Sequence, residues 1–204
     1  MTVNAEKPRW SFYLLWIAGA VLCVPLAFFL NLLFVRIVTP FVGDFVYVAG
    51  VPHITEDYFY MYTFIPIAGL LTGLLQYGLL RRYLARMSWW VAMTLGGWLV
   101  GVFLDLLPGW LGWTSPLFTA GLAMIVLGLS IGVGQWLLLR RRFPRAGWWI
   151  GANVVGWGSL ALIFQGPSIG PFELFSLGLL PACATAAVLA LLLQPAQTAE
   201  PQRL

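Results

Sequence analysis

Long runs of apolar residues dominate the chain, and polar residues gather in short breaks between them. Six runs approach the roughly 20 residues that a helix needs to cross about 30 Å of hydrocarbon. None of them alternates apolar and polar positions as a membrane strand does. The pattern predicts an all-α integral membrane protein, a six-helix bundle forming one domain over residues 1–204. We expect helices at about 10–38, 56–84, 88–107, 116–142, 146–165 and 172–194.

The composition excludes a soluble domain. Hydrophobic residues make up 61% of the chain and charged residues 9%, against about 45–50% and about 25% in soluble domains. The two cysteines lie inside separate apolar runs without a CxxC partner. A zinc or redox motif therefore lacks its ligands.

Ten of the eleven Lys and Arg residues fall on one side of the predicted spans. The positive-inside rule makes this side cytoplasmic, so we expect both termini in the cytoplasm and the connection at 39–54 outside. The Arg clusters between helices are expected to set the orientation and to attract anionic lipid. They comprise Arg81, Arg82, Arg86, Arg140, Arg141, Arg142 and Arg145.

The opposite side is acidic. Glu56 and Asp57 follow Thr55, and a capping side chain before two acids indicates the start of a helix. Together with Asp105 and Glu173 they form an outer acidic cluster, which is either a cation site or a set of solvated helix ends. The basic exception on this side is Arg36, which we expect to snorkel to the headgroups or to pair with Asp44 or Asp105.

A segment repeats with a period of 59 residues. Residues 73–98 and 132–157 are identical at 11 of 26 aligned positions without a gap. Each repeat unit, about 69–101 and 128–160, contains two predicted spans, so the copies share one orientation. The sequence therefore predicts a parallel duplicated helical hairpin.

Tryptophan pairs and glycines recur in both copies. The pairs that open the second helix of each hairpin are expected to be interfacial anchors; they are Trp89 with Trp90 and Trp148 with Trp149. Glycines four residues apart are expected to allow close helix contact. These glycine pairs are Gly69 with Gly73, Gly97 with Gly101, Gly128 with Gly132 and Gly147 with Gly151.

Gln76 and Gln135 recur at the same place inside the predicted membrane. An amide in hydrocarbon needs a hydrogen-bond partner. We therefore expect both Gln side chains to face the interior and to bond between helices, with Trp98 and Trp157 as candidate partners. The alternative is that the two Gln residues line a ligand site.

The repeat also carries a resemblance. Gly-x-x-Gln-Trp-x-Leu-Leu-Arg-Arg followed by Ala-Gly-Trp-Trp, at Gly132–Trp149, resembles a motif of uncharacterised multi-pass membrane proteins from cyanobacteria and Chloroflexota-type bacteria. The resemblance covers the second to the fifth predicted helix. It implies a protein of the bacterial inner membrane and no particular activity.

Catalytic constellations are missing from the sequence. The chain has one His, no His-x-x-x-His, no Gly-x-Ser-x-Gly and no Gly-rich phosphate loop. We expect no enzyme, no metal, no cofactor and no nucleic-acid partner. The first hypothesis is an accessory or scaffold subunit of a bacterial membrane complex, with a membrane-protein partner or self-association. The alternatives are a small carrier or channel, or a protein that binds a lipid, quinone or pigment.

Overall fold

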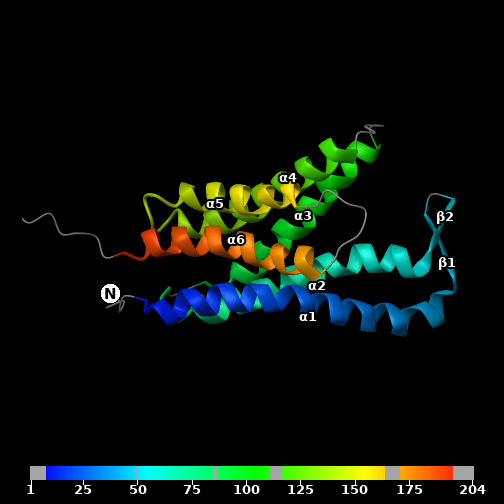
Figure 1. Cartoon of the computed structure of the whole chain (residues 1–204), viewed down its shortest axis with the longest axis horizontal. Coiled ribbons are helices and arrows are strands. Elements are labelled where there is room, and N and C mark those ends of the chain that lie inside the picture. The colour runs from blue at the N-terminus through cyan, green and yellow to red at the C-terminus, as the bar shows by residue number, and fades with distance from the viewer. Residues whose placement is uncertain (1–7, 49, 85–86, 111–115, 164–170, 195–204) are drawn as a thin grey trace, which may run out of the picture.

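The computed structural model describes residues 8–48, 50–84, 87–110, 116–163 and 171–194. Within these ranges the chain is almost entirely helical, which confirms the predicted all-α class (Figure 1). The elements are α1 (Trp10–Val42), β1 (Phe45–Val48), β2 (Val51–Ile54), α2 (Thr55–Leu80), α3 (Trp90–Trp110), α4 (Pro116–Leu139), α5 (Gly147–Gly158), the 3-10 helix η1 (Ser159–Leu162) and α6 (Pro171–Leu192).

Four helices of the described chain are long and apolar enough to cross a membrane. They are α1, α2, the Leu122–Leu139 part of α4 and the Phe172–Leu192 part of α6. The apolar stretch Trp90–Leu104 of α3 is shorter. The six predicted helices are therefore present, and four of them have the length and composition of a membrane span.

The fifth predicted helix, at about 146–165, changes from an α-helix to a 3-10 helix along its length. The α-helical part α5 ends at Gly158, and η1 continues it to Leu162. Ser159 Oγ donates a hydrogen bond to the Gly156 carbonyl at 2.8 Å at this point. A serine hydroxyl that bonds the backbone of the preceding turn competes with regular helix bonding, and the apolar run alone does not reveal this.

Part of the connection predicted at 39–54 is helical. Helix α1 continues to Val42, and the Gly43 N–H donates to the Thr39 carbonyl at 2.9 Å. Thr39 Oγ1 also donates to the Val35 carbonyl at 2.9 Å. Gly43 then ends the helix with a φ of 90°, a conformation that favours glycine.

Strands β1 and β2 follow as an antiparallel hairpin with Phe45 opposite Ile54 and Val48 opposite Val51. Gly50, with a φ of 81°, lies in the turn. Aromatic and β-branched residues favour such pairing, whereas the sequence-based prediction contained helices and no strand.

Thr55 is the first residue of α2 and does not cap it. The residue before the helix is Ile54, and no side chain caps this end. The Thr55 N–H donates to the Asp44 carbonyl at 3.0 Å, while its Oγ1 is buried without a partner among the described residues. The predicted acids, Glu56 and Asp57, do lie in the first turn.

The helices pack in chain order, each against the next, and α6 packs against α1. Figure 1 shows that α1 begins and α6 ends at one end of the molecule, while the β1–β2 hairpin lies at the other. One cluster of buried apolar residues includes Trp16, Trp90 and Trp149. The second core cluster surrounds Trp98 and Trp157.

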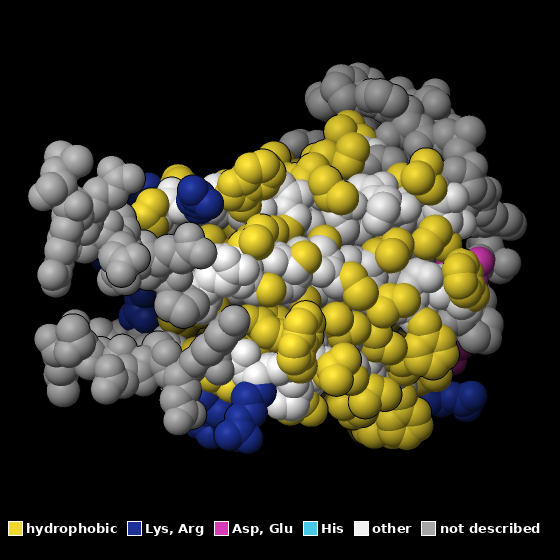
Figure 2. Space-filling model, turned by 60° about the vertical axis from the view of Figure 1, so that its left-hand side comes forward, with side chains coloured by type: hydrophobic (Ala, Val, Ile, Leu, Met, Phe, Trp, Pro, Cys, Tyr) yellow, Lys and Arg dark blue, Asp and Glu magenta, His cyan; other side chains and the backbone are white. Residues whose placement is uncertain are grey.

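The outer surface is largely apolar. Figure 2 shows hydrophobic side chains spread along the helices, with acidic side chains visible only toward one end of this face. Many large apolar side chains are exposed, among them Leu14, Leu22 and Phe29 of α1. A surface of this extent suggests a membrane location, because soluble monomers rarely expose large contiguous apolar patches.

Candidate binding site between the helices

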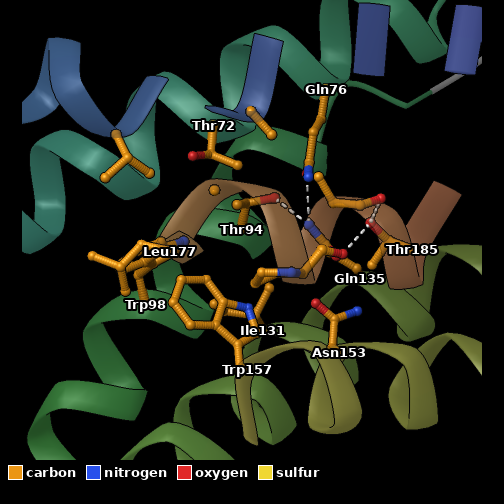
Figure 3. A pocket seen from close by; sticks show the side chains of 15 residues that line it. Thr72, Gln76, Thr94, Trp98, Ile131, Gln135, Asn153, Trp157, Leu177 and Thr185 are labelled. Carbon is orange, nitrogen blue, oxygen red and sulfur yellow. Dashed lines mark hydrogen bonds between the residues drawn. The ribbon is translucent and has the colours of Figure 1, made fainter. Parts of the chain in front are cut away.

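Gln76 on α2 and Gln135 on α4 are buried, and their amides meet between the helices (Figure 3). Gln135 Nε2 donates to Gln76 Oε1 at 2.9 Å and to Thr94 Oγ1 at 2.8 Å. The indole of Trp90 donates to Gln76 Oε1 at 3.0 Å, and that of Trp149 donates to Gln135 Oε1 at 2.8 Å. These five side chains, here called the polar layer, link α2, α3, α4 and α5.

The partners of the two Gln residues correct the sequence-based prediction. Trp98 and Trp157 were the expected donors, but Trp90 and Trp149 occupy that role. Both are fully buried, so they are not the surface anchors that their position at a helix start suggested. Neighbouring residues on a helix point about 100° apart. Of the neighbours Trp89 and Trp90, and likewise of Trp148 and Trp149, only one residue therefore faces outward.

Trp89 and Trp148 are the outward members, with 66% and 67% of their surfaces exposed. They lie close in the chain to the Arg residues of the predicted cytoplasmic side. Every described Arg of the two clusters is exposed, and the Arg140 guanidinium lies 5.0 Å from the centre of the Trp136 ring. Arg86 lies outside the described residues. The described members of the two clusters are Arg81, Arg82, Arg140, Arg141, Arg142 and Arg145.

Trp98 and Trp157 contact each other, and these two residues are here called the tryptophan pair. Their ring centres are 5.0 Å apart with an interplanar angle of 88°, an edge-to-face arrangement. Each is only 5% exposed. Among the described residues, neither indole nitrogen has a hydrogen-bond acceptor.

A small cavity adjoins the polar layer. It is here called the polar cavity, because amide and hydroxyl side chains contribute to its lining. Its volume is about 30 Å³, and Gln76, Thr94, Gln135 and Asn153 contribute to its lining (Figure 3). Asn153 Nδ2 donates to the Trp149 carbonyl at 2.9 Å, which directs the amide nitrogen away from its other neighbours. A polar cavity of this size has room for one or two water molecules.

A larger cavity, here called the apolar chamber, has a volume of about 340 Å³. All six α-helices contribute to its wall, which is formed mainly by aliphatic and aromatic side chains. Phe28, Tyr60, Phe64, Val102 and Met124 are among them. The tryptophan pair borders both the apolar chamber and the polar cavity. The volume lies within the range of about 300–1,000 Å³ that is typical of ligand pockets.

Three of the four predicted glycine pairs lie at close helix contacts. A Cβ added at Gly69 would lie 2.9 Å from Trp98 Cγ, and one at Gly97 would lie 2.6 Å from Ile131 Cα. The second hairpin repeats the first of these contacts, since a Cβ at Gly128 would lie 3.0 Å from Trp157 Cβ. The prediction of a close helix contact is wrong for the fourth pair. No neighbour lies within 4 Å of a Cβ added at Gly147 or Gly151.

The outer acidic residues do not assemble into a metal site within the described part of the chain. Glu56, Asp57 and Glu173 lie in the first turns of α2 and α6. The side chain of Asp105 lies outside the described residues. Arg36 is exposed near the end of α1, and it forms no ion pair with Asp44.

Two further polar contacts attach α1 to its neighbours. Asn31 is fully buried, and its Nδ2 donates to the Tyr60 carbonyl at 2.8 Å, while Thr63 Oγ1 donates to its Oδ1. The Trp16 indole donates to Thr185 Oγ1 at 3.1 Å. Isolated polar residues inside apolar runs were the sequence signal for these contacts, but their pairing depends on the packing of α1, α2 and α6.

Comparison with known proteins identifies no relative: no family model, no curated protein and no solved structure matches the chain.

Proposed function

We propose that this chain is a non-catalytic multi-pass membrane protein that binds a small apolar molecule in the apolar chamber. The chamber itself carries the proposal. It is an open pocket of about 340 Å³ bordered by all six α-helices, a volume within the range that is typical of ligand pockets. Its described lining contains no charged side chain, which favours an uncharged ligand over an ion.

This proposal favours the ligand-binding alternative over the other functions that the sequence left open. An ion-driven carrier usually places an ionisable side chain on its pathway, and the described linings of both cavities are uncharged. The accessory or scaffold role stays a prediction. A subunit of that kind is compatible with a bound apolar molecule, and the two roles are tested separately.

The first test is extraction of the ligand from the purified protein. The full chain is expressed in a bacterial membrane, purified in a mild detergent and extracted with organic solvent, and the extract is analysed by mass spectrometry. We expect one apolar compound at a nearly stoichiometric ratio. Only the bulk lipids of the host membrane, in their bulk proportions, would contradict the proposal.

A matched pair of variants locates the binding. Val102→Phe adds a ring inside the apolar chamber, whereas Val100→Phe adds the same ring two residues away at an exposed position. We expect Val102→Phe to lose most of the retained compound and Val100→Phe to keep it. Equal retention by the two variants would place the compound elsewhere.

We further propose six crossings of the bacterial inner membrane with both termini in the cytoplasm. The exposed Arg clusters and the shared end of α1 and α6 support this orientation. Single cysteines at Asp57 and at Arg141, in a background without Cys23 and Cys183, test it. We expect an impermeant thiol reagent outside intact cells to label the first cysteine and not the second. Equal labelling would contradict the orientation.

The exposed Arg residues are proposed to hold anionic lipid, because each is worth about 1 kcal/mol of attraction to an anionic surface. The triple change of Arg140, Arg141 and Arg142 to Gln is expected to reduce the anionic lipid retained in native mass spectrometry. Exposed Arg9, changed to Gln alone, is a control that removes a single charge. Retention equal to that of the unchanged protein would leave the clusters without this role.

A further inference from the structure

The tryptophan pair is an exception among the buried indoles. Trp16 donates its indole N–H to Thr185 at 3.1 Å, and the indoles of the polar layer donate to amide oxygens. The N–H groups of Trp98 and Trp157 have no acceptor among the described residues. Buried polar groups are nearly always hydrogen-bonded, because they have given up their bonds to water. Two such exceptions in direct contact point to an acceptor held in one of the two cavities that they border.

The acceptors of the polar layer that are still free lie on the side of the polar cavity. Gln76 Oε1 already accepts two hydrogen bonds. Thr94 Oγ1 accepts one from Gln135 and donates its own proton to the Trp90 carbonyl at 2.9 Å. Gln76 Nε2 adds further donors without a partner among the described residues. Gln135 Oε1 accepts a single hydrogen bond and Asn153 Oδ1 accepts none among the described residues, but both residues line the polar cavity and not the apolar chamber. The described lining of the apolar chamber therefore offers the two indoles no amide acceptor.

The two indole nitrogens are in contact with open space. Among the described side chains, Thr55 Oγ1 is the single fully enclosed polar atom without a hydrogen bond. The nitrogens of Trp98 and Trp157 also lack a bond, so they are not fully enclosed. Both residues are 95% buried, and both line the polar cavity and the apolar chamber.

We propose that the apolar chamber takes an uncharged ring compound whose carbonyl oxygen accepts hydrogen bonds from the tryptophan pair, the chemistry of a quinone or a cyclic ketone. This inference rests on the proposed function. A carbonyl supplies the missing acceptor without adding a donor, whereas a hydroxyl adds a hydrogen that needs an acceptor of its own. A carboxylate or phosphate lacks a cation in the described lining. The aromatic walls favour a flat ring.

A pair of probes that differ in the carbonyl groups tests this ligand class. A decyl-substituted 1,4-benzoquinone and decylbenzene are titrated against the full chain in detergent, and binding is followed by calorimetry. One hydrogen bond corresponds to a difference of roughly 3- to 10-fold in affinity. We expect the quinone to bind more tightly than decylbenzene by at least that factor.

Phenylalanine variants identify the donors. Trp98→Phe and Trp157→Phe keep an aromatic ring and remove the N–H. We expect each to reduce quinone affinity by roughly 3- to 10-fold and to leave decylbenzene affinity unchanged. Trp148→Phe removes an exposed indole and is the control with no expected change.

The outcomes separate this inference from the proposed function. Equal affinity for the two probes, with binding of both lost in Val102→Phe, overturns the carbonyl recognition and leaves ligand binding in the apolar chamber intact. A quinone preference that survives in the Trp98→Phe, Trp157→Phe double variant also overturns it. Binding of neither probe, or binding unaffected by Val102→Phe, counts against both proposals.

Discussion

The α2–α3 and α4–α5 hairpins place corresponding residues in closely similar surroundings. Leu80 and Leu139 are both fully buried, and the chain leaves each helix through the same turn, with bonds from residues three and four positions later back to these carbonyls. The contacts of Gly73 with Thr94 and of Gly132 with Asn153 also correspond. The predicted duplication of the hairpin stays a prediction, and these matches agree with it.

The two Gln residues nevertheless differ in their hydrogen bonding. Gln135 donates two hydrogen bonds and accepts one, whereas Gln76 accepts two and donates none. The two amides share a single hydrogen bond, in which Gln135 donates and Gln76 accepts, so the two identical residues have different roles. The neighbours reinforce this: Thr94 offers its oxygen to Gln135, while the corresponding Asn153 uses its nitrogen for the Trp149 carbonyl. Two corresponding residues of the repeat thus become one amide whose two donors are both used and one amide with spare donors.

The largest expected effect of a single change is at Gln135. Gln135→Leu removes three hydrogen bonds and leaves Trp149 without an acceptor, and we expect a loss of about 2–4 kcal/mol in the free energy of unfolding. Gln76→Leu removes two bonds and is expected to cost about two thirds as much. Unfolding by SDS in mixed micelles measures both. Equal losses would contradict the asymmetry of the two amides.

The next effect concerns the glycines at helix contacts. A Cβ at Gly97 would lie 2.6 Å from Ile131 Cα, and one at Gly156 would lie 2.6 Å from Pro181 Cα. Each Gly→Ala change at these positions forces helix backbones apart and is expected to cost about 1–3 kcal/mol. Gly96 has open space around its added Cβ. Gly96→Ala is therefore the control, and thermal unfolding in detergent should separate it from the other two. Three equal unfolding temperatures would refute the close contacts.

Trp149→Phe and Trp157→Phe compare an indole that donates with one that does not. The first leaves Gln135 Oε1 without its donor and is expected to cost about 1–2 kcal/mol more than the second. Both changes remove similar apolar area, so the difference isolates the hydrogen bond. The measurement is again SDS unfolding. A larger loss for Trp157→Phe would show that the tryptophan pair has a structural hydrogen bond of its own.

The smallest expected effect is at Thr94. Thr94→Val keeps the side-chain shape but removes one acceptor of Gln135, for an expected loss of about 0.6–1.5 kcal/mol. Ser130 bonds only to carbonyls of its own helix, those of Val126 and Leu127. Ser130→Ala is therefore expected to change stability by a smaller amount. If Thr94→Val and Ser130→Ala lower the free energy of unfolding by equal amounts, Thr94 does not contribute to the difference between the hairpins.

The sequence by itself determined the class of the protein and much of its local structure. Apolar runs of about 20 residues predicted the helices, because backbone groups in lipid must bond within their own segment. The period of 59 residues pointed to Gln76 and Gln135 as special positions, and both are buried and bonded to each other. An amide inside an apolar run must face a partner, so its burial follows from its surroundings in the chain.

Only the tertiary structure decided which groups meet. Trp90 and Trp98 are both within plausible reach of Gln76 in the sequence, and the rotation of α3 about its axis brings Trp90 to the amide. That rotation depends on the packing of α3 against α2 and α4, which brings together residues far apart in the chain. The apolar chamber has the same origin. It is a volume that six helices fail to fill, and no single segment of sequence encodes it.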